Sequence, residues 1–527
     1  MATNGVNASA ATLTKNRTPD STSPLSGLCS TCVDGCIGMC EVGRSAIRAH
    51  ETIYPQPFGI ITTASEKKYP VDFSHFNIMG TAVGAHGIAA DSDKAIFPNV
   101  KLETRLGANG GIKLKLPFVS GGMGSTNVAA NNWEGLAAGM AISGAGLTIG
   151  ENVCGMDPQS TITRGKVVDS PELARRVKLY TRWQRGGYGI VVVQANVEDT
   201  RLGVQEYAIK KLGVKAVELK WGQGAKNIGG EVKIKSLKKA QLLADRGYVV
   251  LPNPYDKNVI QAFEKGGFSE FERHSRVGMV EEESFLDRVK ELRKAGAKYV
   301  SLKTGAYRPA DLARALKFAS KAKVDYLTVD AAGGGTGMSP WKMMNEWGMP
   351  PVELFSLLHK YCEVLASRGE YIPPILPASG FVFEDHIFKG FAMGAPYVKA
   401  ICMARAPLTA AMVGKTIGQK LADGVPPVFV GRFGATVEEV FVEANHLKRE
   451  FGKDYANLPP GAIGVYSYLQ RCAQGLRQMM CGARKFALNY ITRDDLAALT
   501  PDAARISGIN YVMDLDRDEV DKILTGS

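Results

Sequence analysis

Long hydrophobic runs are absent from this sequence of 527 residues. No stretch of about eighteen apolar residues occurs, which is the length that a membrane-spanning helix requires. The polar N-terminal stretch also lacks the apolar core of a secretory signal. We therefore predict no membrane span. The hydrophobic content is nevertheless 45%, which is enough for a large buried core.

The patterns of cysteine and histidine argue against two common kinds of site. The chain has nine cysteines, and five of them are scattered, with none of the density of a disulfide scaffold. These five are Cys154, Cys362, Cys402, Cys472 and Cys481. The seven histidines include no pair at metal-ligand spacing. We expect a reducing compartment, and hence a cytoplasmic location.

Charge of one sign is not concentrated anywhere in the chain. The formal net charge is +12, but Lys and Arg are interleaved with Asp and Glu. No basic block with interspersed aromatic residues occurs, so we predict no nucleic-acid partner. The positive field would instead suit an anionic substrate or an acidic electron-transfer partner.

Four cysteines do form a compact motif near the N-terminus, in the segment CSTCVDGCIGMC. They are Cys29, Cys32, Cys36 and Cys40. This spacing is tighter than that of most structural zinc sites, where two cysteine pairs are usually a dozen or more residues apart. It suits a [4Fe-4S] cluster, in which each iron takes one thiolate. The alternatives are zinc binding, or a cysteine-rich turn that supplies three metal ligands or none.

The composition divides the chain into four stretches. Residues 1–26 are polar and predicted to be disordered, and residues 27–110 hold the cysteine motif, in an N-terminal iron–sulfur segment. Residues 111–425 alternate nine strand candidates, from LPFVSGG to YVKAICMA, with amphipathic helical patterns. Eight or nine such units predict an α/β fold, a (β/α)8 barrel of the TIM type. Residues 426–527 form a predicted C-terminal helical region.

The predicted strand ends carry residues that suit a cofactor, and barrel enzymes place their sites at these ends. Lys303 ends one strand, where its ammonium group would stabilise the negative charge of a reduced flavin. Gly380 and Ala404 follow the last two strands, where barrels commonly bind phosphate. Arg405 would pair with that phosphate or cap a helix. Each glycine-rich loop taken alone is equally explained as a tight turn.

Three segments resemble the FMN-binding domain of the glutamate synthase family: GQGAKNIGGE, YVSLKTG and DYLTVDAAGGGTGMSP. The resemblance covers roughly residues 95–425. It implies FMN in the barrel mouth and reduction of bound 2-iminoglutarate to glutamate by hydride transfer. The residues that it places around FMN are Met123, Ser125, Gln223, Lys303, Gly334, Gly335, Gly380 and Ala404. It places Lys226 against the substrate.

The chain departs from this family in three ways. Glu231 stands where the family has Gln, and a carboxylate there would repel the acidic end of a glutarate, so a different substrate is expected. The family's own cysteine-rich loop after the last barrel strands is missing, and only Cys402 remains there. The glutaminase domain is absent, so nitrogen would come from ammonia, an amine or a partner subunit. Subunits of N-methylglutamate synthase are a stand-alone subclass that would fit.

We therefore predict an FMN and [4Fe-4S] oxidoreductase that reduces an imine or, in reverse, oxidises an amine or amino acid. Lys226, Lys303 and Glu231 are the candidate catalytic residues. A ferredoxin-like redox partner or partner subunit is expected, as is a homo-oligomer. The alternatives are a flavin-containing electron-transfer subunit without its own substrate site, or another barrel enzyme such as a hydroxy-acid dehydrogenase. The latter needs a histidine at a strand end, and none is evident.

Overall fold

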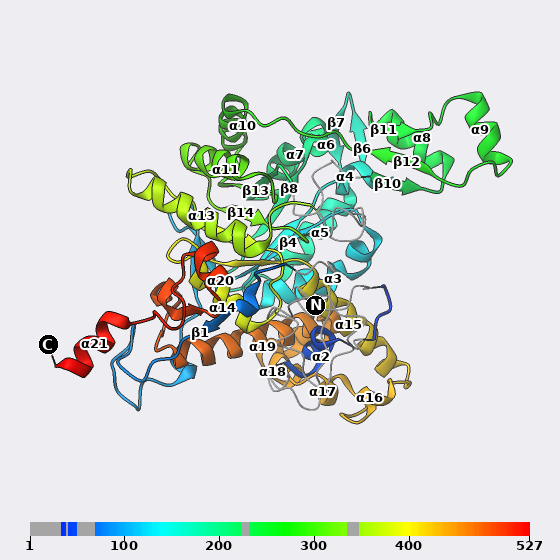
Figure 1. The fold of residues 1–527 in the computed structure, drawn as a ribbon. Coiled ribbons are helices and arrows are strands. Elements are labelled where there is room, and N and C mark those ends of the chain that lie inside the picture. Colours follow the sequence, from blue (N-terminus) through cyan, green and yellow to red (C-terminus); the bar gives the residue numbers. More distant parts are fainter. Residues whose placement is uncertain (1–32, 38–39, 50–68, 223–230, 335–346, 527) are drawn as a thin grey trace, which may run out of the picture.

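A computed structural model describes residues 33–37, 40–49, 69–222, 231–334 and 347–526 of the chain (Figure 1). Cys29, Cys32, Gln223, Lys226 and Gly335 lie outside these residues, as does the side chain of Glu231. The predictions that concern these residues are therefore not tested by the structure.

Eight parallel strands close into a barrel, which confirms the predicted (β/α)8 fold. Each strand is a short apolar run that is buried on both faces, as expected for parallel β-structure. The strands are β4 (Phe118–Met123), β5 (Gly146–Ile149), β8 (Val191–Ala195), β9 (Ala216–Lys220), β13 (Tyr299–Thr304), β14 (Leu327–Asp330), β15 (Ile375–Ala378) and β16 (Ile401–Met403). The barrel closes where β16 pairs with β4.

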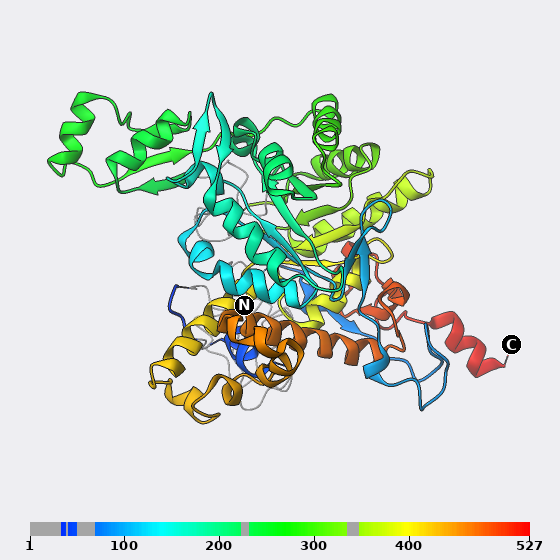
Figure 2. The same ribbon diagram turned by 180° about the vertical axis from the view of Figure 1, so that it is seen from behind.

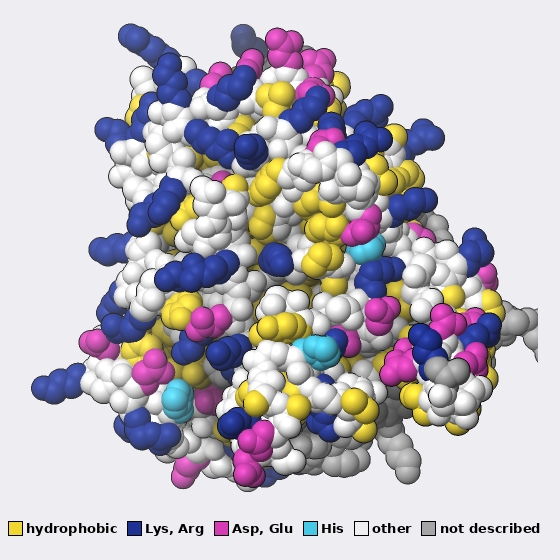
Figure 3. Space-filling model, turned by 90° about the vertical axis from the view of Figure 1, so that its left-hand side faces the viewer, with side chains coloured by type: hydrophobic (Ala, Val, Ile, Leu, Met, Phe, Trp, Pro, Cys, Tyr) yellow, Lys and Arg dark blue, Asp and Glu magenta, His cyan; other side chains and the backbone are white. Residues whose placement is uncertain are grey.

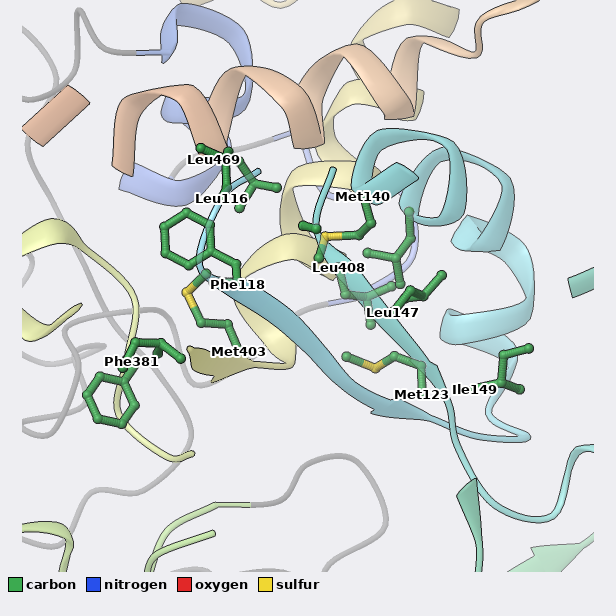
Figure 4. Close-up of a cluster of buried hydrophobic side chains, with 14 of the residues drawn as sticks. Leu116, Phe118, Met123, Met140, Leu147, Ile149, Phe381, Met403, Leu408 and Leu469 are labelled. Atoms are coloured by element: carbon green, nitrogen blue, oxygen red, sulfur yellow. The ribbon is translucent and has the colours of Figure 1, made fainter. Parts of the chain in front are cut away.

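Helices connect successive strands and cover the outside of the barrel. They are α3 (Asn127–Ile142), α4 (Val153–Met156), α5 (Pro171–Trp183), α6 (Val197–Leu202), α7 (Val204–Leu212), α10 (Glu282–Lys294), α11 (Pro309–Lys321), α13 (Pro351–Ala366), α14 (Glu384–Met393) and α15 (Arg405–Ala422). Figure 4 shows part of the apolar layer between the barrel strands and the helices outside them. In this layer Phe118 of β4 and Leu147 of β5 lie near Leu408 of α15 and Leu469. Burying a side chain of this size stabilises the fold by roughly 1.5–3 kcal/mol.

The longest connection between barrel strands carries an inserted subdomain. After β9 the chain forms a small antiparallel sheet in the order β10-β12-β11, with two helices, before it reaches α10. These elements are β10 (Glu231–Ile234), α8 (Leu237–Asp245), β11 (Val249–Leu251), α9 (Lys257–Glu264) and β12 (Phe271–His274). The insert projects from one side of the molecule (Figures 1 and 2). The strand candidate YVVLPNP is β11, so its prediction as a barrel strand was wrong.

A hairpin closes the end of the barrel at which the eight parallel strands begin. Its strands β2 (Thr104–Leu106) and β3 (Ile112–Leu114) place Leu106, Ile112 and Leu114 into the apolar core inside the barrel. Asp325 fixes the hairpin, because its carboxylate accepts hydrogen bonds from the Ala108 and Val300 amides at 3.2 and 2.8 Å. The other β-hairpin on the barrel is β6 (Thr161–Thr163) with β7 (Lys166–Asp169).

Segments from both ends of the chain pack together against the barrel. Strand β1 (Phe76–Ile78) pairs antiparallel with β17 (Leu496–Ala498). The remaining elements are α2 (Glu41–Arg48), η3 (Phe73–His75), η4 (Phe97–Asn99), α16 (Val428–Gly431), α17 (Val437–Val440), α18 (Ala444–Phe451), η5 (Gly452–Asn457), α19 (Pro460–Gly482), η6 (Leu488–Tyr490), η7 (Arg493–Asp495), α20 (Pro501–Ser507) and α21 (Arg517–Thr525). No helix in the described ranges is long and apolar enough to cross a membrane.

Helix α19 approaches the barrel helices closely because small residues line the contact. A Cβ added at Gly135 of α3 would lie 2.8 Å from the Cα of Gly461 in α19. A Cβ added at Gly414 of α15 would lie 2.6 Å from the carbonyl oxygen of Pro460. Only glycine fits at these two positions. The two glycines therefore allow α19 to pack closely against α3 and α15.

Candidate active site

Seven of the predicted site residues that the structure describes lie at the same end of the barrel. Met123 is the last residue of β4, and Lys303 is the next-to-last residue of β13. Ala404 directly follows β16, while Gly380 and Gly334 lie in the loops after β15 and β14. Since all eight strands are parallel, these residues meet at the C-terminal mouth of the barrel. Ser125 and Arg405 lie at this same mouth.

Lys303 forms a buried ion pair inside the mouth. Its Nζ atom lies 3.2 Å from Oδ2 of Asp330, and both side chains are less than a tenth exposed. Burial alone would lower the pKa of Lys303, but the charges of Asp330 and Glu218 outweigh it and hold the pKa above its ordinary value. Lys303 therefore carries a fixed positive charge at the end of β13.

Glu218 of β9 lies beside this pair and is held by side chains of two other barrel strands, β8 and β14. The amide nitrogen of Gln194 donates to its Oε1 at 2.5 Å, and the hydroxyl of Thr328 donates to its Oε2 at 3.2 Å. Complete burial raises the pKa of Glu218, while the charge of Lys303 opposes that rise. Gln194, Glu218 and Asp330 were missed as site residues. A polar side chain within a very apolar strand, as in AVELK, was the signal that could have found Glu218.

The loops around the mouth bring backbone close to neighbouring backbone. A Cβ added at Gly124 would lie 2.4 Å from the carbonyl oxygen of Glu151, so the end of β4 packs directly on the end of β5. After β15, Ser379 and Gly380 have φ angles of 90° and 81°. The Ser379 hydroxyl donates to the carbonyl of Ala332 at 3.0 Å. A non-glycine residue in this conformation is strained and is commonly held so at a functional site.

The start of α15 offers backbone donors at the mouth. This helix has 18 residues, and its N-cap Ala404 has no side chain that caps the first turn. The first N–H groups of such a helix point out of its N-terminus and, with the helix dipole, favour an anion. Arg405 is the first residue of the helix.

A cavity of about 730 Å³ borders the mouth on the side of β8, β9 and β13. Lys220 and Trp221 contribute to its wall, and the segment with Gln223 and Lys226 follows directly in the sequence. Lys220 pairs with Glu151 at 2.8 Å. Trp221 packs edge-on against Phe285 with ring centroids 5.1 Å apart, so it serves packing as well as lining the cavity.

The middle of the cysteine motif contacts α3. Cys40 is the N-cap of α2, and its sulfur accepts a hydrogen bond from the Gly43 amide at 3.4 Å. Asp34 lies between Cys32 and Cys36, and its carboxylate accepts a hydrogen bond from the side-chain amide of Asn131 at 3.0 Å. This contact joins the motif to α3, the helix that follows β4. No group of three metal-ligating side chains occurs in the described ranges, which omit Cys29 and Cys32. The cluster stays a prediction.

The fold and this mouth define a (β/α)8-barrel protein with a buried cation, Lys303, and a helix N-terminus at the C-terminal ends of its strands. Comparison with known families identifies the group to which it belongs. The family model described as the conserved region in glutamate synthase matches residues 66–241 and 272–412, more than half of the chain. The chain is therefore a member of the glutamate synthase family. The unmatched stretch between the two ranges includes β11 and α9 of the insert.

Individual relatives are distant. The glutamate synthase large subunit-like protein YerD of Bacillus subtilis is 27% identical over 187 residues. That alignment covers 35% of this chain and 32% of YerD, so the chain spans about a third of the length of this relative.

Solved structures resemble the chain only in outline. A variant of flavocytochrome b2 with sulfite bound is 11% identical, with a TM-score of 0.45, over 81% of this chain and 76% of that one. An IMP dehydrogenase/GMP reductase-like protein from Corynebacterium glutamicum is 10% identical, with a TM-score of 0.43, over 81% and 93%. Such values do not identify a function.

Proposed function

We propose that this protein is an FMN-dependent oxidoreductase that reduces a C=N bond or oxidises the corresponding amine, and that a [4Fe-4S] cluster exchanges electrons with the flavin. The observation that carries the proposal is the buried Lys303–Asp330 pair at the mouth of a glutamate synthase-family barrel. A permanently charged ammonium group at that place suits a cofactor that gains negative charge on reduction.

The residues at the mouth fit FMN. The close packing at Gly124 leaves backbone rather than side chains at the end of β4, where a flat ring system needs room. The uncapped N-terminus of α15, with Gly380 beside it, fits the phosphate. Bound there, FMN would supply hydride chemistry. Lys303 would hold the negative edge of the ring, and Asp330 would keep Lys303 in place.

The described half of the cysteine motif fits a metal cluster. Cys40 is buried at the N-terminus of α2, where its sulfur accepts a hydrogen bond from the Gly43 backbone amide. Cys36 is only partly buried. The hydrogen bond between Asp34 and Asn131 holds this segment against α3, the helix that follows β4. A cluster held beside this helix would exchange electrons with the flavin.

The substrate is proposed to be an imine or amine that carries an anionic group. Lys226 would contact that group, and Glu231 would disfavour the second carboxylate of a glutarate. A substrate with one carboxylate and an N-substituent fits these residues better than 2-iminoglutarate. The nitrogen is proposed to come from ammonia, an amine or a partner subunit.

A hydroxy-acid dehydrogenase is the second candidate. Such enzymes need a catalytic histidine at a strand end. None of the three residues that follow any barrel strand is a histidine. The observation favours chemistry at nitrogen over chemistry at a hydroxyl group.

Turnover by the isolated chain separates these possibilities. Anaerobic protein is mixed with an artificial electron acceptor and, in turn, with N-alkyl amino acids, unsubstituted amino acids and 2-hydroxy acids. The proposal predicts acceptor reduction with amines and no reduction with hydroxy acids. Turnover of a hydroxy acid would replace the proposal with the second candidate. Flavin that dithionite bleaches but no substrate reduces would instead indicate an electron-transfer subunit.

A further inference from the structure

A second cavity lies at the closed end of the barrel, away from the mouth. Its volume is about 420 Å³, and it lies where the β2–β3 hairpin meets the connection between α14 and β16 and the residues after α19. The lining residues that carry the argument are Arg105, Lys113, Lys399, Glu103, Phe391 and Leu488. Figure 3 shows one face of the molecule, over which Lys and Arg side chains are spread with hydrophobic ones between them.

Two of the cations that line this cavity lie directly opposite each other in the hairpin. Arg105 of β2 is directly opposite Lys113 of β3 in the hairpin register, and both side chains are exposed on the hairpin face that points away from the barrel core. Like charges at directly opposite positions of an antiparallel pair destabilise it. Two cations in this arrangement are tolerated best when an anion lies between them.

Lys399 adds a third cation from the barrel itself. Its side chain is half-buried, and burial lowers its pKa. In the part of the chain that the structure describes, no carboxylate forms an ion pair with Arg105, Lys113 or Lys399. The Arg105 guanidinium donates only to the carbonyl of Gly110, at 3.3 Å. Glu103 accepts a hydrogen bond from the Tyr188 hydroxyl at 2.7 Å. Three cations and one carboxylate leave a surplus of two positive charges.

The remaining wall is apolar and aromatic. Phe391, Pro396, Leu488 and Ile491 line it, and the Asn489 side chain supplies a neutral polar group. Small-molecule sites combine apolar walls of this kind with a few placed polar groups, within volumes of about 300–1,000 Å³. A phosphate monoester carries a charge close to −2 at pH 7, which matches the surplus.

We propose that this cavity is a binding site for an organic monophosphate with a flat, apolar body. Lys399 and Lys113 would contact the phosphate, with Arg105 as a bidentate donor, and Phe391 and Leu488 would cover the apolar part. The site is separate from the barrel mouth and does not depend on the proposed redox function. Since the ligand would bridge the hairpin, the barrel and the C-terminal segment, its binding would stabilise their junction.

Calorimetric titration of the flavin-loaded protein with adenosine monophosphate tests the proposal, with adenosine and inorganic phosphate as comparison ligands. The expected result is saturable binding of adenosine monophosphate, at least tenfold tighter than binding of either comparison ligand. Lys399→Gln and Lys113→Gln should each weaken it at least tenfold while flavin content is unchanged. The matched control Lys178→Gln changes an exposed lysine of α5 and should bind as the wild type does.

Three results would overturn the proposal. The first is an absence of saturable binding to the wild-type protein. The second is binding of adenosine monophosphate that neither lysine substitution weakens, because the ligand then occupies another place. The third is inorganic phosphate binding as tightly as adenosine monophosphate, since the apolar wall would then contribute nothing. Melting temperatures of the two variants within a few degrees of the wild type show that they are folded.

Discussion

Nζ of Lys303 lies 3.2 Å from Oδ2 of Asp330, on neighbouring barrel strands, and both groups are almost fully buried. The pair brings a positive charge to the barrel mouth without leaving it unpaired. Removing one partner of such a pair is costly, because the other remains buried and charged.

The Lys303–Asp330 pair predicts non-additive effects of substitution. Lys303→Met and Asp330→Asn should each destabilise the protein, by about 3–5 kcal/mol for the more damaging change. The double variant should be less destabilised than the sum of the single ones. Urea unfolding of all four proteins measures this coupling. Additive effects would show that the two charges do not depend on one another.

Lys303→Met should also reduce activity by about 10²–10³-fold, the usual effect of removing one preorganised donor at developing negative charge. The flavin should become harder to reduce, because the anionic form loses its partner. Potentiometric titration of the bound flavin measures this directly. An unchanged midpoint potential in folded Lys303→Met protein would place Lys303 away from the ring.

Stability should depend on pH through Asp199. Complete burial raises the pKa of this carboxyl to about 7 from its ordinary value of 3.8, against the hydrogen bond from the Asn152 amide. The folded protein therefore binds more protons than the unfolded chain between these pH values. Its stability should fall as pH rises through this window, by up to about 1.4 kcal/mol per pH unit.

Asp199→Asn isolates this contribution, since the amide stays neutral. The variant should gain stability relative to the wild type as pH rises from 4 to about 7, measured as the difference in unfolding free energy. Asp518→Asn, on exposed helix α21, is the matched control and should leave the difference flat. If the difference in unfolding free energy between Asp199→Asn and the wild type did not change with pH, the Asp199 carboxyl would not titrate in this range.

Gly124→Ala should disrupt the mouth. Its Cβ would lie 2.4 Å from the carbonyl oxygen of Glu151, so β4 and β5 must separate at their ends. We expect a loss of about 1–3 kcal/mol of stability together with weaker flavin binding. Gly431→Ala is the control, because nothing lies within 4 Å of its added Cβ. The fluorescence of flavin released on dilution measures how much flavin each variant retains. Equal flavin retention in both variants would show that Gly124 is not part of the flavin site.

Cys36→Ser and Cys40→Ser should abolish iron binding. Cys40→Ser should still cap α2, since serine is a favourable N-cap residue, so lost iron would not reflect a lost helix. Cys481→Ser changes a partly buried cysteine outside the motif and should retain iron. Iron and acid-labile sulfide are measured on anaerobic samples. Full iron content in the Cys36 and Cys40 variants would rule out ligation by this motif.

The barrel was predictable because its strands are buried on both faces and read as continuous apolar runs. Eight of the nine strand candidates form it, and YVVLPNP forms β11 of the insert instead. Hydrophobic pattern alone does not separate a short barrel strand from a strand of a small antiparallel sheet. The inserted subdomain was therefore not foreseen.

The polar layer of the mouth was only partly predictable. Lys303 stood out at a strand end, whereas Glu218 and Gln194 lie within strands and face inward only because the barrel closes. Asp330 becomes the partner of Lys303 through the register of β13 and β14. The contact between Asp34 and Asn131 joins residues 97 positions apart, and nothing local in either segment signals it.

Cofactor content tests the central claim most directly. The protein is purified without oxygen, and iron, sulfide and flavin are quantified on one sample, with an absorbance spectrum before and after dithionite. The account predicts about four irons and one FMN per chain, with the flavin bleached on reduction. Zinc in place of iron, or a chain without flavin, would contradict it.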